Sequence, residues 1–497
     1  MRLTRRSLLR QALAGVALGG GSSSFAASLV PVLRGQTDSA RMAQLVQLLV
    51  QTPRDHVLEA VAGEIRAGAD YLDVLAALML AGVREVQPRP SVGFKFHTVL
   101  AVISYHLIAT NLPAQDRWLP IFWGIDYFKV AQAGDEQEGN WRQGPVDEAS
   151  VPTAEKACES LVDALQRWDE SAADSAAAAV ARHIEMAKAF ELFYPFGARD
   201  FRSIGHKAIF VMCAQRTLEL IGWQHAEPIL RSLAYALLMH EGGNPAERDD
   251  PADRPWRQID KLVVKTAPEL NGGPPDREVS TRLLGILRTG SDADAIEAVM
   301  EHVKRGASIS SVWDGIHCGA AELQLRAPNI VSLHAVTTTH AIHFAFQTTG
   351  DARMRRMLML QNAAMIPLFR DAAAQRGQLQ DAPIDQLEPI LPAGSDDAVI
   401  LEICRNFGGQ RRKAAQGLLG YLQSGRPAAP LVARIQQLIS QKGNSSHDFK
   451  FASAAIEGFR HVSDGWRGHC LAAGAMHFRG LDERDSAIVA RTRAALG

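Results

Sequence analysis

The chain has 497 residues, of which 47% are hydrophobic and 22% charged, as is typical of a globular protein with a sizeable buried core. The 53 lysines and arginines nearly balance the 54 aspartates and glutamates, so no basic field attracts a phosphate backbone and we expect no nucleic-acid partner. The five cysteines form no CxxC or CxxCH motif, which argues against a zinc knuckle, a thioredoxin-type dithiol or attached haem and leaves disulfide pairing open.

The first residues are typical of an export signal. Arg5 and Arg6 precede an apolar, glycine-containing run over 11–21, and small residues follow around Ala26. The paired arginines resemble a bacterial twin-arginine signal, although a general secretory signal has a similar layout. We predict a signal peptide over 1–27, the twin-arginine translocase as an export partner, and a periplasmic mature protein. No later stretch has the ~18 uncharged apolar residues of a membrane span, so none is expected.

From residue 39 onward, apolar residues recur at helical spacing, and alternating β-branched runs closed by turn residues are nearly absent. The patterned segments cover 39–80, 93–109, 117–132, 153–193, 205–223, 225–240, 258–305, 312–326, 333–346, 351–375, 396–423, 430–441, 447–462 and 468–478. Polar stretches near 133–152 and 242–258 are possible sub-boundaries, and the first could be a surface loop or lid. We predict one all-α domain over 38–497, a multi-helix bundle or α/α array of helix pairs, with an interior chamber lined by histidines.

The segment LHAVTTTHAIHFAF (333–346) places three imidazoles in an apolar setting, where they are costly unless bonded. At about 100° per residue, His340 and His343 share one helix face, while His334 lies about 180° from His343. The three cannot converge on one atom by themselves. Any site must therefore recruit side chains from other helices.

Three apolar segments open in a similar way, with an early histidine: FHTVLAV (96–102), GHKAIFV (205–211) and LHAVTTT (333–339). The similarity indicates either an old duplication of a helical module or only the frequency of histidine near helix starts. If the segments are related, their histidines could point into one interior. Imidazoles from several helices suit iron, copper or zinc. The candidate metal ligands are His97, His206, His334 and His340; in the alternative, each is a separately bonded core histidine.

Other chemical signatures are sparse. We find no pair of Glu-x-x-His motifs for a di-iron bundle, no HExxH, no P-loop and no GxSxG. Asp314 and Glu322 flank His317 and could support it, or could lie on a solvated helix edge. A histidine could also work without metal, as a base toward a phenolic proton. Possible walls for a small apolar ligand are Phe122, Trp123, Phe344 and Phe346.

Four segments, in this order, resemble the questin oxidase-like family: FHTVLAVISYHLIA (96–109), GHKAIFVMCAQRTLELIG (205–222), LHAVTTTHAIHFAF (333–346) and HDFKFASAAIEGF (447–459). That family is all-α and includes fungal enzymes that oxidatively open anthraquinone rings. The resemblance implies that the catalytic residues lining the chamber are His97, His206, His334, His447 and Lys450. The chain departs from the family in its export signal and in the additional His340 and His343. The family's use of NADPH is not expected in this chain, because no GxGxxG motif follows a predicted strand.

Two hypotheses follow. The first is an exported oxidoreductase that uses helix-borne histidines as metal ligands or acid–base groups on an apolar, quinone-like or polycyclic substrate. The second is a non-catalytic helical scaffold or ligand-binding protein of the periplasm, in which the histidines are structural.

Overall fold

Helices account for almost all regular structure in the computed structural model, which describes residues 39–265 and 270–497. These residues contain 23 α-helices, and their only β-type pairing is a single bridge between Asn271 and Ser308. The all-α prediction is confirmed. Ser39–Gly497 form one compact unit, and the predicted signal peptide lies outside the described residues. No helix in the described ranges combines the length and apolarity needed to cross a bilayer.

The first group of helices surrounds the first histidine segment. Its members are α2 (Ser39–Gln51), α3 (Val57–Arg66), α4 (Tyr71–Glu85), α5 (His97–Leu100), α6 (Val102–Ala109) and α7 (Leu119–Gln137). The predicted loop over 133–152 is wrong at its start, because α7 continues to Gln137. Asp135 on this added turn is buried, accepts a hydrogen bond from the Gln87 N–H (2.9 Å) and pairs with Lys95 (2.9 Å). These contacts hold the extra turn in the helix.

The alanine-rich stretch over 153–193 divides into three helices. With the helices that follow, this group is α8 (Ala157–Arg167), α9 (Glu170–His183), α10 (Met186–Ala198), α11 (His206–Ile221), α12 (Ala226–Leu237) and α13 (Arg254–Lys265). Trp168 ends α8 in a left-handed conformation (φ 58°), and the Asp169 side chain then caps α9. The polar stretch 242–258 is tied back toward α11 by Arg202, which pairs with Asp250 and, at 2.7 Å, with Asp253.

The remaining helices carry the other histidine segments. They are α14 (Arg277–Thr289), α15 (Asp292–Lys304), α16 (Ile309–Arg326), α17 (Ile330–Thr348), α18 (Ala352–Ala374), α19 (Asp396–Asn406), α20 (Arg411–Gln423), α21 (Ala428–Lys442), α22 (Ser446–His461), α23 (Asp464–Ala473) and α24 (Ala487–Leu496). Asn329 caps α17, and Ser445 caps α22 with Asp448 completing a capping box. These caps fix where the first turns of α17 and α22 begin.

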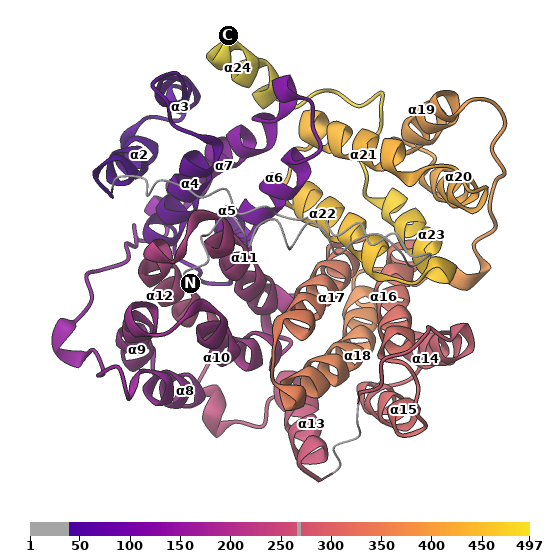
Figure 1. The fold of residues 1–497 in the computed structure, drawn as a ribbon, viewed down its shortest axis with the longest axis horizontal. Helices are drawn as coiled ribbons and strands as arrows, with labels where there is room; N and C mark the ends of the chain where they lie inside the picture. The colour runs from indigo at the N-terminus through magenta and orange to yellow at the C-terminus, as the bar shows by residue number, and fades with distance from the viewer. Residues whose placement is uncertain (1–38, 266–269) are drawn as a thin grey trace, which may run out of the picture. The chain divides into compact units, whose positions relative to one another are not determined.

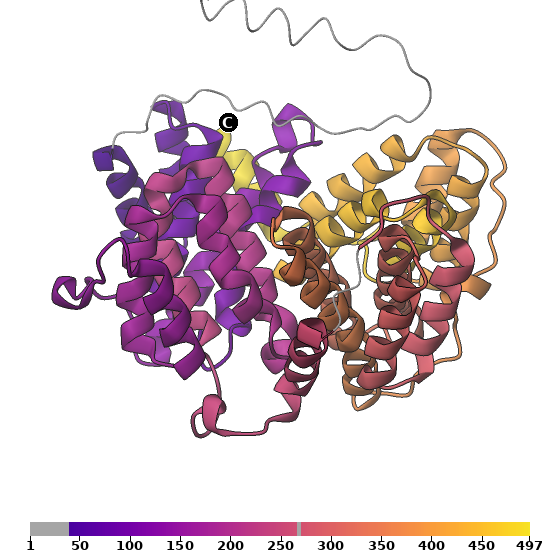
Figure 2. The same cartoon turned by 60° about the horizontal axis from the view of Figure 1, so that its bottom comes forward.

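Helix α17 lies among α11, α16, α18 and α22, and it packs against all four (Figure 1). Figure 2 shows the earlier helices, indigo to magenta, gathered beside the later ones, orange to yellow. Contacts of α11 with α17 and of α6 with α22 join the two groups. Since α17 is covered on nearly all sides, its apolar sequence is that of a buried helix rather than of an amphipathic surface helix.

Candidate metal centre

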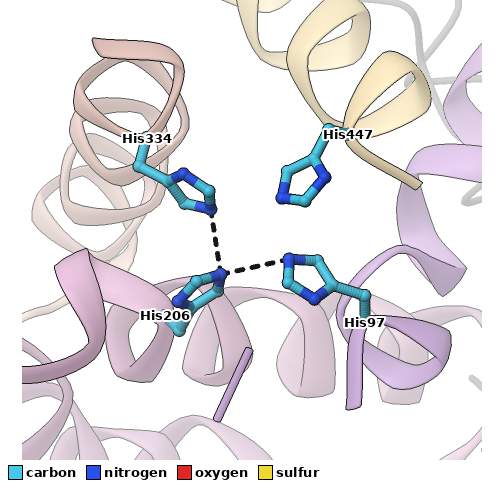
Figure 3. A group of neighbouring side chains, drawn as sticks. All are labelled: His97, His206, His334 and His447. Atoms are coloured by element: carbon cyan, nitrogen blue, oxygen red, sulfur yellow. Dashed lines mark hydrogen bonds between the residues drawn. The ribbon is translucent and has the colours of Figure 1, made fainter. Parts of the chain in front are cut away.

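Four imidazoles from four helices converge in the interior (Figure 3). His97 opens α5, His206 opens α11, His334 follows the first turn of α17, and His447 lies in the first turn of α22. One ring nitrogen from each lies within 4.8 Å of those of the other three. His97, His206 and His334 are at most 4% exposed, and His447 is half-buried. The cluster is therefore one that could hold a metal ion.

Hydrogen bonds to the backbone orient three of these rings. In each, Nδ1 donates to a carbonyl oxygen near the start of its own helix: His97 to Phe94 (2.7 Å), His206 to Ser203 (2.5 Å) and His334 to Ile330 (2.6 Å). Because a carbonyl oxygen can only accept, each Nδ1 carries a proton. In the neutral ring, Nε2 is then left with an unshared electron pair.

These three Nε2 atoms face one another. The His206 Nε2 lies 3.1 Å from that of His97 and 2.9 Å from that of His334 (dashed in Figure 3). Burial, followed by nearby positive groups, holds the pKa of each ring well below its ordinary value, so the rings are neutral at neutral pH. No proton then separates the facing electron pairs.

A metal ion resolves this arrangement. Metal–imidazole bonds of about 2.0–2.1 Å place two ligand nitrogens about 2.9 Å apart at a right angle and about 3.3 Å apart in a tetrahedron. The observed separations of 2.9 and 3.1 Å fall within this range. A histidine that binds a metal through one ring nitrogen usually donates a hydrogen bond from its other ring nitrogen to a carbonyl or carboxylate oxygen. The three Nδ1–H···O bonds here are of that kind, and they fix the tautomer in which Nε2 is unprotonated.

Two further polar groups at the site lack partners. The Nε2 of His447 and the Nζ of Lys450 are buried and have no hydrogen-bond partner in the described part of the chain. Burial lowers the pKa of His447 to about 3 and that of Lys450 to about 7. Lys450 follows His447 by one helical turn, and its charge contributes to the lowered pKa of all four histidines. Buried polar groups left unpaired are costly, so both groups could contact a ligand bound at this site.

The backbone around the site is strained. Phe94, Ser203 and Ile204 have φ of 47°, 56° and 45°, in the left-handed region that residues with a Cβ disfavour. Phe94 and Ser203 are the residues whose carbonyl oxygens hold His97 and His206. Strain of this kind persists only where the surrounding structure imposes it, and it gathers at functional sites.

His340 does not join the cluster. Its Nε2 lies 2.7 Å from the Glu457 carboxylate, which also accepts two hydrogen bonds from Arg216. Six residues separate His340 from His334, which is about 240° of helical rotation and about 9 Å of rise. The structure places His447, and not His340, beside the other three histidines.

The remaining candidates have other partners. Asp314 accepts hydrogen bonds from Ser463, and Glu322 pairs with Arg288 and Arg326, so both carboxylates serve helix packing. His317 instead contacts another histidine. Its Nε2 lies 2.9 Å from the Nδ1 of His343.

The proposed aromatic walls lie in several parts of the core. Phe122 packs on Trp118, Trp123 packs on Phe449, and Phe346 packs on Trp313. Phe344 lies beneath the Arg216 guanidinium. Phe122 has a partner near it in sequence, whereas the partners of Trp123, Phe344 and Phe346 come from other helices.

Sequence reasoning missed the elements that orient the rings. The carbonyls of Phe94, Ser203 and Ile330 carry no side-chain signature. Gly93, just before the first histidine segment, is a sequence feature that could have indicated close packing of the backbone against the site. A Cβ there would lie 3.1 Å from the His206 Cε1 and 3.4 Å from the His97 Cε1, so the backbone packs directly on two of the rings.

Comparisons of the chain with protein-family models, curated proteins and solved structures gave no match. The geometry of the four histidines is therefore the observation on which a functional proposal must rest.

Proposed function

We propose that this chain is a metal-dependent oxidoreductase whose ion is bound by His97, His206, His334 and His447. The observation that carries the proposal is the meeting of three Nε2 atoms at 2.9 and 3.1 Å, each on a ring whose Nδ1 faces a backbone carbonyl oxygen. Ordinary core histidines pair a donor with an acceptor. Three acceptors directed at one another need a cation.

The donor set is compatible with a redox-active ion. Imidazole suits iron, copper and zinc alike, and four neutral rings leave the positive charge of the ion uncompensated. Iron or copper held in this way supplies single-electron chemistry when bound. Zinc would supply only polarisation, so metal identity separates an oxidoreductase from a hydrolytic or structural site.

Lys450 favours a substrate with an acidic hydroxyl group. Its buried Nζ lacks a partner in the described residues, and a protonated amine there would hold a phenolate-like oxygen against the cluster. Its pKa of about 7 lets it also donate or accept that proton near neutral pH. A phenol or quinol meets this requirement, in keeping with the resemblance of the four histidine segments to the questin oxidase-like family.

The decisive experiment combines metal analysis with turnover. Protein expressed with its N-terminal segment and recovered from the periplasm should carry about one iron or copper per chain and should consume oxygen with quinols or hydroxylated polycyclic quinones. His334→Ala should lose both properties. His469→Ala is the matched control, because His469 is also buried but contacts Trp466 in α23.

Other results would count against the proposal. A metal-free, colourless protein in which His334→Ala changes only stability would favour the scaffold hypothesis. Zinc in place of iron or copper would remove the redox assignment. Export is tested separately, since replacing Arg5 and Arg6 by lysine should retain the protein in the cytoplasm if the twin-arginine route is used.

A further inference from the structure

Two cysteines from different helices meet in the later half of the chain. Cys318 in the middle of α16 and Cys470 in α23 place their sulfur atoms 3.6 Å apart. Cys318 is fully buried, and Cys470 is 9% exposed. All five cysteines are free thiols, and Cys213 directs its thiol to the carbonyl of Val99 instead. The Cys318–Cys470 contact is separate from the histidine cluster and has no part in the proposed reaction.

The packing of α16 and α23 keeps the two thiols in register. Ser463, which precedes α23, donates from its backbone N–H (2.9 Å) and its hydroxyl (2.5 Å) to the carboxylate of Asp314 in α16. Asp314 lies one helical turn before Cys318 on the same helix. The start of α23 is therefore fastened to the turn of α16 that precedes the thiol, and the two sulfurs cannot easily drift apart.

Room for closure exists beside the pair. Cys470 borders a cavity of about 20 Å³, which is also lined by Ala320, Ala321 and Gly474. A disulfide has its sulfurs about 2.05 Å apart, so closure needs about 1.6 Å of approach, shared between two side chains. The small neighbours and the adjoining space leave the cysteine side chains room to rotate toward each other.

We propose that Cys318 and Cys470 are an oxidisable pair that closes to an intramolecular disulfide joining α16 to α23. Two S–H bonds break and one S–S bond forms. The two electrons and the two protons pass to an oxidant of the disulfide class, whose own S–S bond breaks as it becomes two thiols. The bond closes a long loop that contains α17, α18 and α22. It therefore lowers the conformational entropy of the unfolded chain and stabilises the folded protein. Burial raises the pKa of the Cys318 thiol, so closure should be slow with bulky oxidants.

Peptide mapping of the native protein tests the proposal. The full chain is treated with oxidised glutathione or with diamide, unfolded, alkylated, and digested without reductant. The expected product is one cross-linked peptide pair containing Cys318 and Cys470, with the other three cysteines alkylated. The melting temperature should rise by about 5 °C on oxidation and return with dithiothreitol.

Single substitutions provide the controls. Cys318→Ala and Cys470→Ala should each abolish the cross-link and the rise in melting temperature. Cys404→Ala, which removes another buried thiol, should leave both unchanged. Alkylation of Cys318 and Cys470 after oxidation of the folded wild-type protein would overturn the proposal, as would a cross-link to any other cysteine.

Discussion

Replacing His206 by alanine should weaken metal binding while sparing the fold. His206 is the central member of the cluster, because its Nε2 lies 3.1 Å from the His97 Nε2 and 2.9 Å from the His334 Nε2. Structural zinc sites with four ligands bind with about 10–16 kcal/mol, or about 3 kcal/mol per ligand. We therefore expect the dissociation constant for the preferred ion to rise by about 10²-fold.

The same substitution has an unusual effect on the metal-free protein. Truncating an ordinary buried side chain leaves a cavity and costs about 1–3 kcal/mol. Here the truncation also removes two close contacts between unshared electron pairs. The metal-free variant should therefore lose less stability than His469→Ala, which truncates a buried histidine outside the cluster.

A chelator competition assay and paired melting curves measure both effects. Wild-type protein and His469→Ala should show a higher melting temperature with metal than with excess chelator. In His206→Ala this difference in melting temperature should be smaller, by the equivalent of about 3 kcal/mol. An unchanged dissociation constant in His206→Ala, or a wild-type melting temperature insensitive to every first-row metal tested, would refute the assignment of the site.

Three further predictions probe the surroundings. Gly93→Ala places a Cβ 3.1 Å from the His206 Cε1, so metal affinity should fall about 10-fold by calorimetric titration; Gly134→Ala, whose Cβ meets nothing within 4 Å, should not change it. Lys450→Met removes an unpartnered buried amine and should stabilise the metal-free protein below about pH 7 by about 1–3 kcal/mol in urea unfolding; destabilisation would mean that the amine is already paired. Burial lowers the pKa of His317 from 6.5 to about 3. As pH falls, this histidine is therefore protonated in the unfolded chain before it is protonated in the folded one. The free energy of unfolding should drop by about 2 kcal/mol between about pH 7 and about pH 5 because of His317 alone. If His317→Gln lost as much stability over this pH range as the wild-type protein, the prediction would be wrong.

Periodicity and end signals predicted the helical class, but not where the long patterned stretches divide. The alanine-rich stretch over 153–193 looked continuous because alanine favours a helix everywhere. It is broken at Trp168, a large residue in a left-handed conformation that propensity would not select. The added turn of α7 had the opposite cause, since the buried pairing of Asp135 with Lys95 stabilises a segment whose composition is that of a loop.

The site was predictable where the signal was local. The early histidines at positions 97, 206 and 334 share a position near helix starts, and the structure brings these three together. His340 failed as a ligand because helical rotation says which face a residue occupies, but not which helix covers that face. The partner of His340 is Glu457, which lies more than a hundred residues away and is unpredictable from spacing alone.

The energetics of the site argue that it evolved around an occupant. Three residues with a Cβ in the left-handed region cost about 1 kcal/mol or more each. The facing Nε2 atoms and the unpartnered Lys450 add to this cost. Natural domains have only about 5–15 kcal/mol of net stability, so features that all oppose folding are retained when binding offsets them. A bound cation removes the conflict among the Nε2 atoms, and an anionic ligand would satisfy Lys450. The two partners together would account for polar groups that have no hydrogen-bond partner within residues 39–265 and 270–497.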